Sequence, residues 1–182
     1  VIPLPDLKSW FGFDIKGLVK QNYLKATSNY KDLITDDSLA HFIAIPTEKN
    51  GKPYYKPLMN VLSCISKINR GSKNPPIVIV ESTLAPKVSD KKIIPFFKKK
   101  NLIVGENILL SIAPRRDWFI EGGKNLESLD RVYGSTDEKS AKVAKDVLSI
   151  VCKKLHLASS YKVSEMVKSV ENAYRHMDIT LA

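Results

Sequence analysis

Three polar side chains near the end of the sequence recur at helical spacing and have the chemistry to bind an anionic oxygen. Lys168 and Asn172 are four residues apart and Arg175 follows three residues later, so all three share one face of a helix predicted from about Ser164 to Ala182. Ammonium, amide and guanidinium groups are all hydrogen-bond donors, which an anionic oxygen can accept from. The same stripe could also be the solvated face opposite an apolar one, and on spacing alone that is the simpler interpretation.

A second group of candidates lies where buried strands are expected to end. Pro46 and Thr47 close the run LAHFIAIPT, while Glu81, Ser82 and Thr83 follow the apolar part of PPIVIVES. Parallel sheets present side chains to their ligands at the carboxyl ends of the strands, so these are candidate cofactor contacts. Thr47 also fits a simple turn residue, and for Glu81 a structural role at a buried strand end is the simpler interpretation.

Adjacent arginines, Arg115 and Arg116, follow a third apolar run, NILLSIAP. Guanidinium groups bind phosphate or carboxylate bidentately, so this pair is a candidate for substrate binding. The two cysteines, Cys64 and Cys152, have no partner at metal-ligand or redox spacing, and we expect both to be buried thiols. No metal site is expected.

The elements that would position these residues alternate between strand and helix. Short apolar runs at 39–47, 75–82, 107–114 and RVYGS are separated by longer amphipathic stretches, a pattern typical of an α/β fold with a mostly parallel sheet. Helices are expected from Pro57 to Arg70, in a basic stretch interrupted by Pro95, and after a capping box of Ser135 and Glu138. The final helix has an apolar stripe, comprising Met166, Val170, Ala173, Tyr174, Met177 and Leu181.

The net charge of +10 attracts polyanions, acidic membranes and phosphorylated ligands alike. The densest basic run, Lys91-Lys92 and Lys98 to Lys100, surrounds the apolar residues of IIPFF. Interleaved aromatics could mark a nucleic-acid surface, but a helix with one buried side and solvated lysines is the simpler interpretation. The sequence shows neither an apolar run long enough to span a membrane nor a secretory signal, so we expect a cytoplasmic protein.

Five segments, in order, resemble the UDP-glucose/GDP-mannose dehydrogenase family of nucleotide-sugar 6-dehydrogenases. They are IAIPT, ESTLAPKV, APRRDW, VYGS and EMVKSVENAYR, and the likeness extends from about Leu24 to Ala182. The resemblance implies a partial Rossmann-like, mostly parallel sheet with flanking helices, ending in a long connecting helix. It also implies NAD as cofactor and oxidation of a nucleotide sugar's primary alcohol to the uronic acid through intermediates held on a cysteine.

The same resemblance implies roles for individual residues. Lys168 and Asn172 correspond to donors that stabilise charge on the reacting oxygen, and Thr83 to a residue that lies near the nicotinamide and helps to position water. Pro46 and Thr47, with Glu81 and Ser82, lie on the cofactor side. Arg115 and Arg116 do not follow from the resemblance, and we expect them, with Arg175, to bind substrate through their guanidinium groups. The final helix is expected to form a homodimer core, and nucleic acid is not the expected partner.

The sequence also departs from the family's pattern. Lys87-Val88 replaces the usual Gly-Thr, Arg115-Arg116 replaces a glutamate, no GxG motif occurs, and neither cysteine matches the family's nucleophile. We therefore expect a chain incomplete at both ends, beginning after the first βαβ unit. Residues 1–158 would be the later part of the NAD-binding domain and 159–182 the start of the central dimerisation helix. The rival hypothesis is a non-catalytic basic module that binds nucleic acid or another polyanion.

Overall fold

The computed structural model describes residues 14–29, 32, 38–68, 74–115 and 130–182, and the structural statements below concern these residues. The chain divides into two compact units, Val1–Ile34 and Thr35–Ala182. The first contains the short helix α2 (Ile15–Lys20), whose N-cap Asp14 accepts a hydrogen bond from the Lys16 N–H. The candidate site lies in the second unit.

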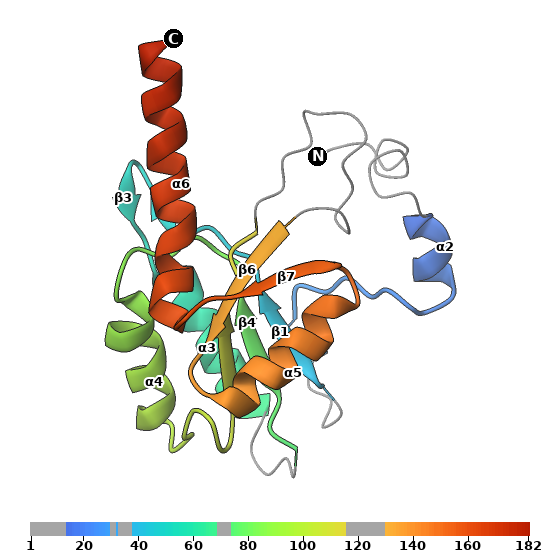
Figure 1. Cartoon of the computed structure of the whole chain (residues 1–182). Helices are drawn as coiled ribbons and strands as arrows, with labels where there is room; N and C mark the ends of the chain where they lie inside the picture. The colour runs from blue at the N-terminus through green and yellow to red at the C-terminus, as the bar shows by residue number, and fades with distance from the viewer. Residues whose placement is uncertain (1–13, 30–31, 33–37, 69–73, 116–129) are drawn as a thin grey trace. The chain divides into compact units, whose positions relative to one another are not determined.

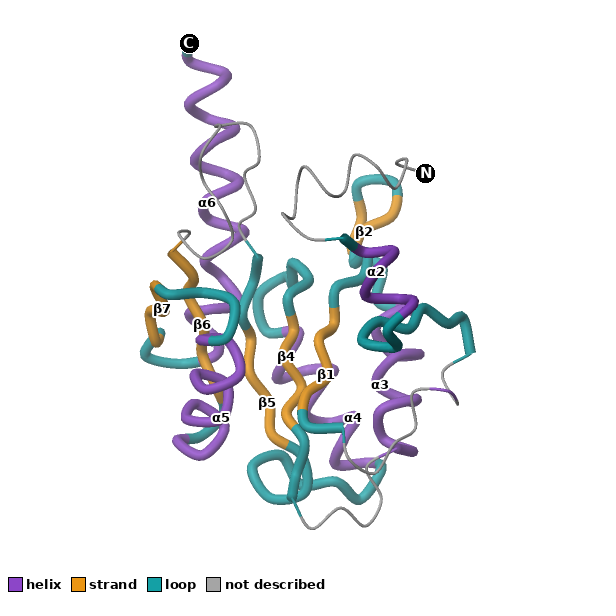
Figure 2. The backbone as a smooth tube through the Cα atoms, turned by 90° about the vertical axis from the view of Figure 1, so that its right-hand side faces the viewer, coloured by secondary structure: helices purple, strands orange, loops and turns teal. Residues whose placement is uncertain are grey.

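A five-stranded sheet in the order β1-β4-β5-β6-β7 forms the centre of the second unit (Figure 2). β1, β4 and β5 run parallel, β6 is antiparallel to β5, and β7 is parallel to β6. The strands span Ala40–Ile43 (β1), Ile77–Val80 (β4), Leu109–Ile112 (β5), Asp130–Ser135 (β6) and Lys154–Leu157 (β7). A separate hairpin pairs Glu48–Lys49 (β2) with Lys52–Pro53 (β3). The predicted mostly parallel α/β fold is confirmed.

Helices cover both faces of this sheet because its central strands are apolar on both sides. Every residue of β4 and β5 is buried, as expected of parallel strands inside an α/β layer structure. Val78 and Val80 join a core with α3 (Lys56–Ile68) and α4 (Ile94–Lys99). Ile77 and Ile79 point the other way, into a core with α5 (Glu138–Ser149).

The basic run forms a helix with one buried side, as the simpler interpretation predicted. Ile93 and Phe97 are fully buried, whereas the lysines on either side of IIPFF are exposed. The helix is not interrupted at Pro95: a π-helical turn, Ser89–Ile93, leads directly into α4, with the proline in its first turn. Proline has no N–H to bond back along the helix, and the irregular π-helical hydrogen-bond pattern lies directly before it.

The start of α5 differs from the prediction. Its N-cap is Asp137, which accepts hydrogen bonds from the Ser140 N–H and hydroxyl, and not Ser135. Ser135 is the last residue of β6, where it pairs with Ser111 and donates to that residue's hydroxyl over 3.0 Å. The pairing of β6 with β5 therefore keeps Ser135 in the sheet and moves the cap two residues along the chain.

The long final helix α6 (Tyr161–Leu181) begins one turn earlier than predicted, after the N-cap Ser160. Its first turn packs closely on β6, where a Cβ added at Gly134 would lie 2.5 Å from the Ser160 carbonyl oxygen. Its carboxyl-terminal part extends away from the sheet (Figure 1). The apolar stripe is exposed there, from Met166 at 38% to Leu181 at 86%.

The cysteine prediction holds for one thiol only. Cys152 is buried, whereas Cys64 on α3 is partly exposed, and neither of these two described residues forms a disulfide bond. The described residues contain no cluster of three or more potential metal ligands. None of the described helices has the length and apolar character needed to cross a membrane.

Candidate cofactor and catalytic site

The carboxyl ends of β1 and β4 are joined by a direct contact between two predicted site residues. The Thr47 hydroxyl donates to the Thr83 carbonyl oxygen over 2.5 Å. Because β1 and β4 are adjacent and parallel, the segments that follow them meet at one edge of the sheet. Both threonines are partly exposed and Pro46 beside them is exposed, so this edge remains accessible.

Ser82 strengthens the same junction from inside. Its buried hydroxyl accepts from the Ile45 N–H and donates to the Ile45 carbonyl oxygen, each over 2.8 Å. This side chain replaces strand pairing where β1 has ended, which keeps the backbone groups of Ile45 bonded. Ser82 thus shapes the site through the backbone, and its direct contact with a cofactor stays a prediction.

Glu81 pairs with a residue that sequence analysis missed. The Arg131 guanidinium, from β6, donates through Nη2 to the Glu81 carboxylate and, over 3.0 Å, to the Ala113 carbonyl oxygen. Both ionic side chains are buried, which requires such a pairing. The pair ties the ends of β4, β5 and β6 together and supports the structural interpretation of Glu81. The sequence contained a signal for the burial of Arg131. It lies two residues before the buried Tyr133 in a predicted strand, so the two side chains are on the same face.

Of the two adjacent arginines, Arg115 lies within the described residues. Arg115 follows β5 and is partly exposed. Its backbone N–H donates to the Glu81 carbonyl oxygen over 3.4 Å. It is therefore at the same sheet edge as Thr83. Arg116 falls outside the described residues, so its predicted role remains a prediction.

Helix α6 brings Lys168 close to this edge. Two serines on its inner face bond to backbone carbonyl groups near this edge. Ser164 donates to the carbonyl of Ile112, the last residue of β5, over 2.6 Å, and Ser169 donates to the carbonyl of Leu84, in the segment after β4, over 3.4 Å. Lys168 lies between them along the helix and is partly buried. Asn172 and Arg175, further along α6, are exposed, so only the start of the predicted polar stripe is held against the sheet.

The first turn of α6 is also anchored through Tyr161. Its hydroxyl donates to the Asp90 carboxylate, and burial together with this bond raises the pKa of Tyr161 to about 12. The hydrogen bond from Tyr161 in turn lowers the pKa of Asp90, helped by Lys162 at 3.1 Å. At neutral pH the anchor is therefore a neutral phenol on an ionised carboxylate.

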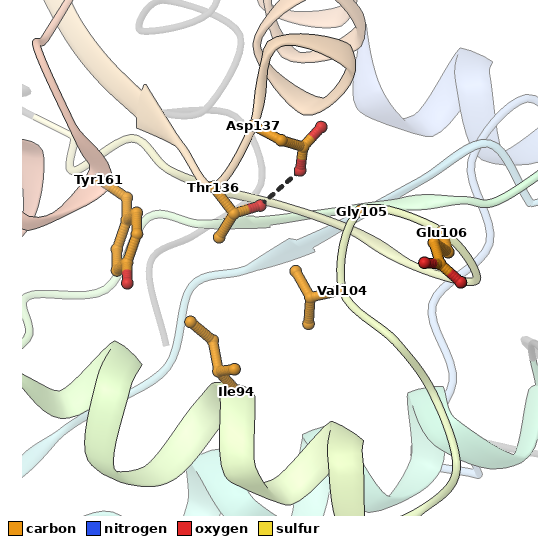
Figure 3. Close-up of a pocket in the computed structure, with 7 residues that line it drawn as sticks. All are labelled: Ile94, Val104, Gly105, Glu106, Thr136, Asp137 and Tyr161. Atoms are coloured by element: carbon orange, nitrogen blue, oxygen red, sulfur yellow. Dashed lines mark hydrogen bonds between the residues drawn. The ribbon is translucent and has the colours of Figure 1, made fainter.

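A hollow of about 460 Å³ lies at the other end of the strands (Figure 3). It is lined by Ile94, Val104, Gly105, Glu106, Thr136, Asp137 and Tyr161. The Thr136 hydroxyl donates to the Asp137 carboxylate over 2.8 Å. Burial raises the pKa of Asp137, but hydrogen bonds from Ser140 and Thr136 outweigh it and the net pKa is lowered. This carboxylate already serves the α5 cap, and the hollow is separate from the Thr47 and Thr83 junction.

The residues at the Thr83 edge fit one part of a dinucleotide. Accessible hydroxyls at the ends of adjacent parallel strands suit the nicotinamide end, whereas the glycine-rich turn that receives the pyrophosphate is not in this sequence. Among the described strands, β1 pairs on one side only, with β4. A parallel sheet with helices on both faces and an accessible carboxyl edge defines part of a Rossmann-like dinucleotide-binding domain.

Comparison with known proteins identifies the family. The sequence model for the NAD-binding domain of the UDP-glucose/GDP-mannose dehydrogenase family matches residues 13–151, and the chain belongs to this family. The match confirms the predicted resemblance and NAD as the cofactor of this domain. It begins before Leu24, where the likeness was expected to start.

Individual relatives agree with this assignment. UDP-N-acetyl-D-mannosamine dehydrogenase of Methanococcus aeolicus is 32% identical over 154 residues, which is 81% of this chain and 33% of that protein. Protein CapL of Staphylococcus aureus is 29% identical over 168 residues, 90% of this chain and 38% of that protein. The structure of UDP-D-ManNAc dehydrogenase from Pyrococcus horikoshii matches with a TM-score of 0.79 and 27% identity, covering 91% of this chain and 39% of that one. The chain thus spans well under half the length of these relatives.

Proposed function

We propose that this chain is part of an NAD-dependent nucleotide-sugar 6-dehydrogenase, which oxidises the primary alcohol of a UDP- or GDP-linked hexose or N-acetylhexosamine to the uronic acid. The observation that carries the proposal is the junction of Thr47 with Thr83 at the carboxyl edge of β1 and β4. Both residues were expected on the cofactor side from the family resemblance, and they meet at the edge where a doubly wound sheet binds dinucleotides.

The names of relatives favour one substrate class within this proposal. Those most similar include UDP-N-acetyl-D-mannosamine dehydrogenases and a UDP-N-acetyl-D-glucosamine 6-dehydrogenase of Pseudomonas aeruginosa, which is 28% identical over 170 residues. We therefore propose a UDP-linked N-acetylhexosamine as the substrate.

The chain's own residues have distinct tasks in this proposal. The Thr83 hydroxyl would contact the nicotinamide end of bound NAD, which supplies the hydride acceptor, and Thr47 holds the Thr83 backbone in place. Lys168 and Asn172 donate to the oxygen on which charge develops. Arg115, Arg116 and Arg175 bind the anionic groups of the substrate. The thiol that forms the covalent intermediate comes from the part of the enzyme outside this sequence.

Nuclear magnetic resonance of this chain tests the cofactor edge directly. Titration with NAD should shift the amide signals of Thr47 and Thr83, and Thr83→Val should weaken binding by threefold or more. The matched control is Thr136→Val, which removes the same hydroxyl beside the hollow at the other end of the strands. Shifts centred on Thr136 and Asp137, with Thr47 and Thr83 unaffected, would contradict the proposed cofactor edge.

A further inference from the structure

Glu165 is a buried carboxylate on α6 to which the proposed chemistry assigns no role. It is 2% exposed, although α6 is otherwise mostly open to solvent. It lies three residues before Lys168 and four before Ser169, so the three side chains share one helix face.

The carboxylate is held by donors from the segment that follows Thr83. Oε2 accepts from the Lys87 N–H over 2.8 Å, and Oε1 accepts from the Ser89 N–H and hydroxyl over 2.8 and 2.9 Å. Lys87 has a φ of 69° and Val88 is right-handed helical, a sequence of conformations that turns backbone N–H groups toward one anion. Three converging donors suit a carboxylate and not an amide, whose NH₂ group would face a donor.

These contacts join the two parts of the proposed site over a short path. The segment Lys87–Ser89 begins four residues after Thr83, and α6 carries Lys168 one turn after Glu165. Ser169 bonds to Leu84 on the same path. A slip of one residue along α6 would move Lys168 by about 1.5 Å and rotate it by about 100°, so the Glu165 contacts determine where the ammonium lies.

We propose that Glu165 is a positioning residue, which fixes the axial position and rotation of α6 so that Lys168 and Asn172 stand opposite Thr83. The assignment of those residues to catalysis rests on the proposed function. The geometric part, that Glu165 sets the position of α6 against the Thr83 segment, stands independently of it.

The geometric part is tested on this chain by a distance measurement between spin labels. Labels are attached to Lys98→Cys on α4 and Met177→Cys on α6, after Cys64 and Cys152 have been replaced by alanine. Glu165→Gln should broaden the distance distribution at least twofold. Asp178→Asn, which removes an exposed carboxylate from the same helix, is the matched control and should leave it unchanged.

The catalytic part is tested by turnover of the complete dehydrogenase. Misplacement of Lys168 should lower kcat by tenfold or more in Glu165→Gln while KM changes less than threefold, since the donors act mainly in the transition state. Asp178→Asn should change neither constant. A loss of stability alone would lower the concentration of folded enzyme. Each kcat is therefore calculated from the concentration of folded enzyme.

The outcomes separate this inference from the proposed function. The positioning role is overturned if Glu165→Gln has the same distance distribution as the unaltered chain. It is also overturned if Asp178→Asn broadens the distribution as much as Glu165→Gln does. If Glu165→Gln does not fold, the test uses Ser89→Ala, which removes one of the three donors to the carboxylate. This variant should broaden the distance distribution to a smaller extent. An unchanged distribution in Ser89→Ala also overturns the inference. Absence of any turnover in the complete, unaltered enzyme contradicts the proposed function and leaves the distance result standing.

Discussion

Lys168 is the residue on which the catalytic proposal most directly depends, and the structure gives it a setting that distinguishes it from the other lysines. It is partly buried and lies along the helix between two serines, one of which bonds to the end of β5 and the other to the segment after β4, whereas the lysines of the IIPFF run are exposed. In the complete enzyme, Lys168→Ala should therefore lower kcat by about a hundredfold or more, because an oxyanion partner is lost in the transition state. Steady-state kinetics measures this, and normal turnover would remove the assignment.

The control is a triple replacement of Lys98, Lys99 and Lys100 by alanine. It removes more charge but should barely change turnover, because these side chains are solvated. If the chain were a polyanion-binding module, the order would reverse: the triple variant would bind nucleic acid more weakly and with less salt dependence.

Lys87 shows at the scale of one residue how a departure from the family pattern acts on the backbone. Its left-handed φ of 69° is a conformation that favours glycine. Relief of the left-handed strain contributes about 1–2 kcal/mol, and the entropic cost of glycine is about 0.5–1 kcal/mol. Lys87→Gly should therefore raise the free energy of unfolding by up to about 1.5 kcal/mol. Urea denaturation measures the change. Lys100→Gly, at a residue with negative φ, should destabilise the chain instead.

At the scale of elements, the cap of α5 predicts a pH-dependent stability. The Asp137 carboxylate accepts a hydrogen bond from the Ser140 N–H at the N-terminus of this helix. Asp137→Ala should therefore lower the free energy of unfolding by about 1 kcal/mol at neutral pH. The pKa of Asp137 is lower in the folded state than its ordinary value, so its contribution is complete above the unfolded pKa and is lost as the pH falls through the folded one. The difference in stability between the variant and the unaltered chain should therefore begin to shrink once the pH falls below about 4. Ser135→Ala, at the residue first expected to cap α5, should show no such pH dependence.

The exposed stripe of α6 predicts self-association, which was expected from the sequence and is untested. Val170, Tyr174 and Met177 are each more than half exposed on one helix face, and covering them would remove apolar surface from water. Sedimentation equilibrium should detect a dimer, and Met177→Glu should weaken dimer formation by at least tenfold. Arg175→Glu is the control, because it places a glutamate on the opposite face of the helix and should change dimer formation little. A strictly monomeric species at high concentration would contradict the prediction.

At the scale of the whole molecule, the sequence lacks two components that the proposed reaction needs. It contains no GxG motif for the pyrophosphate and no cysteine at the family's nucleophile position. It spans 33% of the Methanococcus aeolicus relative and 40% of the Pseudomonas aeruginosa relative. The isolated chain should therefore show no reduction of NAD with UDP-N-acetylmannosamine or UDP-N-acetylglucosamine. The dehydrogenase of Pyrococcus horikoshii, assayed alongside, provides the positive control. Reduction above background by this polypeptide alone would overturn the view that it is a partial enzyme.

The order of strands and helices, and the polar residues at the carboxyl ends of β1 and β4, could be predicted from the sequence because their signals are local. Apolar runs such as PPIVIVES mark buried strands, and polar residues such as Thr83 follow directly at the strand ends. Lys168 and Asn172 could likewise be placed on one helix face, since that depends only on their spacing.

Only the tertiary structure decided which of these groups meet and which are bonded elsewhere. The Arg131–Glu81 pair joins residues 50 positions apart, and the contact of Glu165 with Lys87 spans 78 positions. Ser135 lost its predicted cap role because the antiparallel register of β5 and β6 keeps it in the sheet. Such contacts depend on strand register and helix packing across the whole unit, and the physical reason they escape sequence analysis is that no local spacing encodes them.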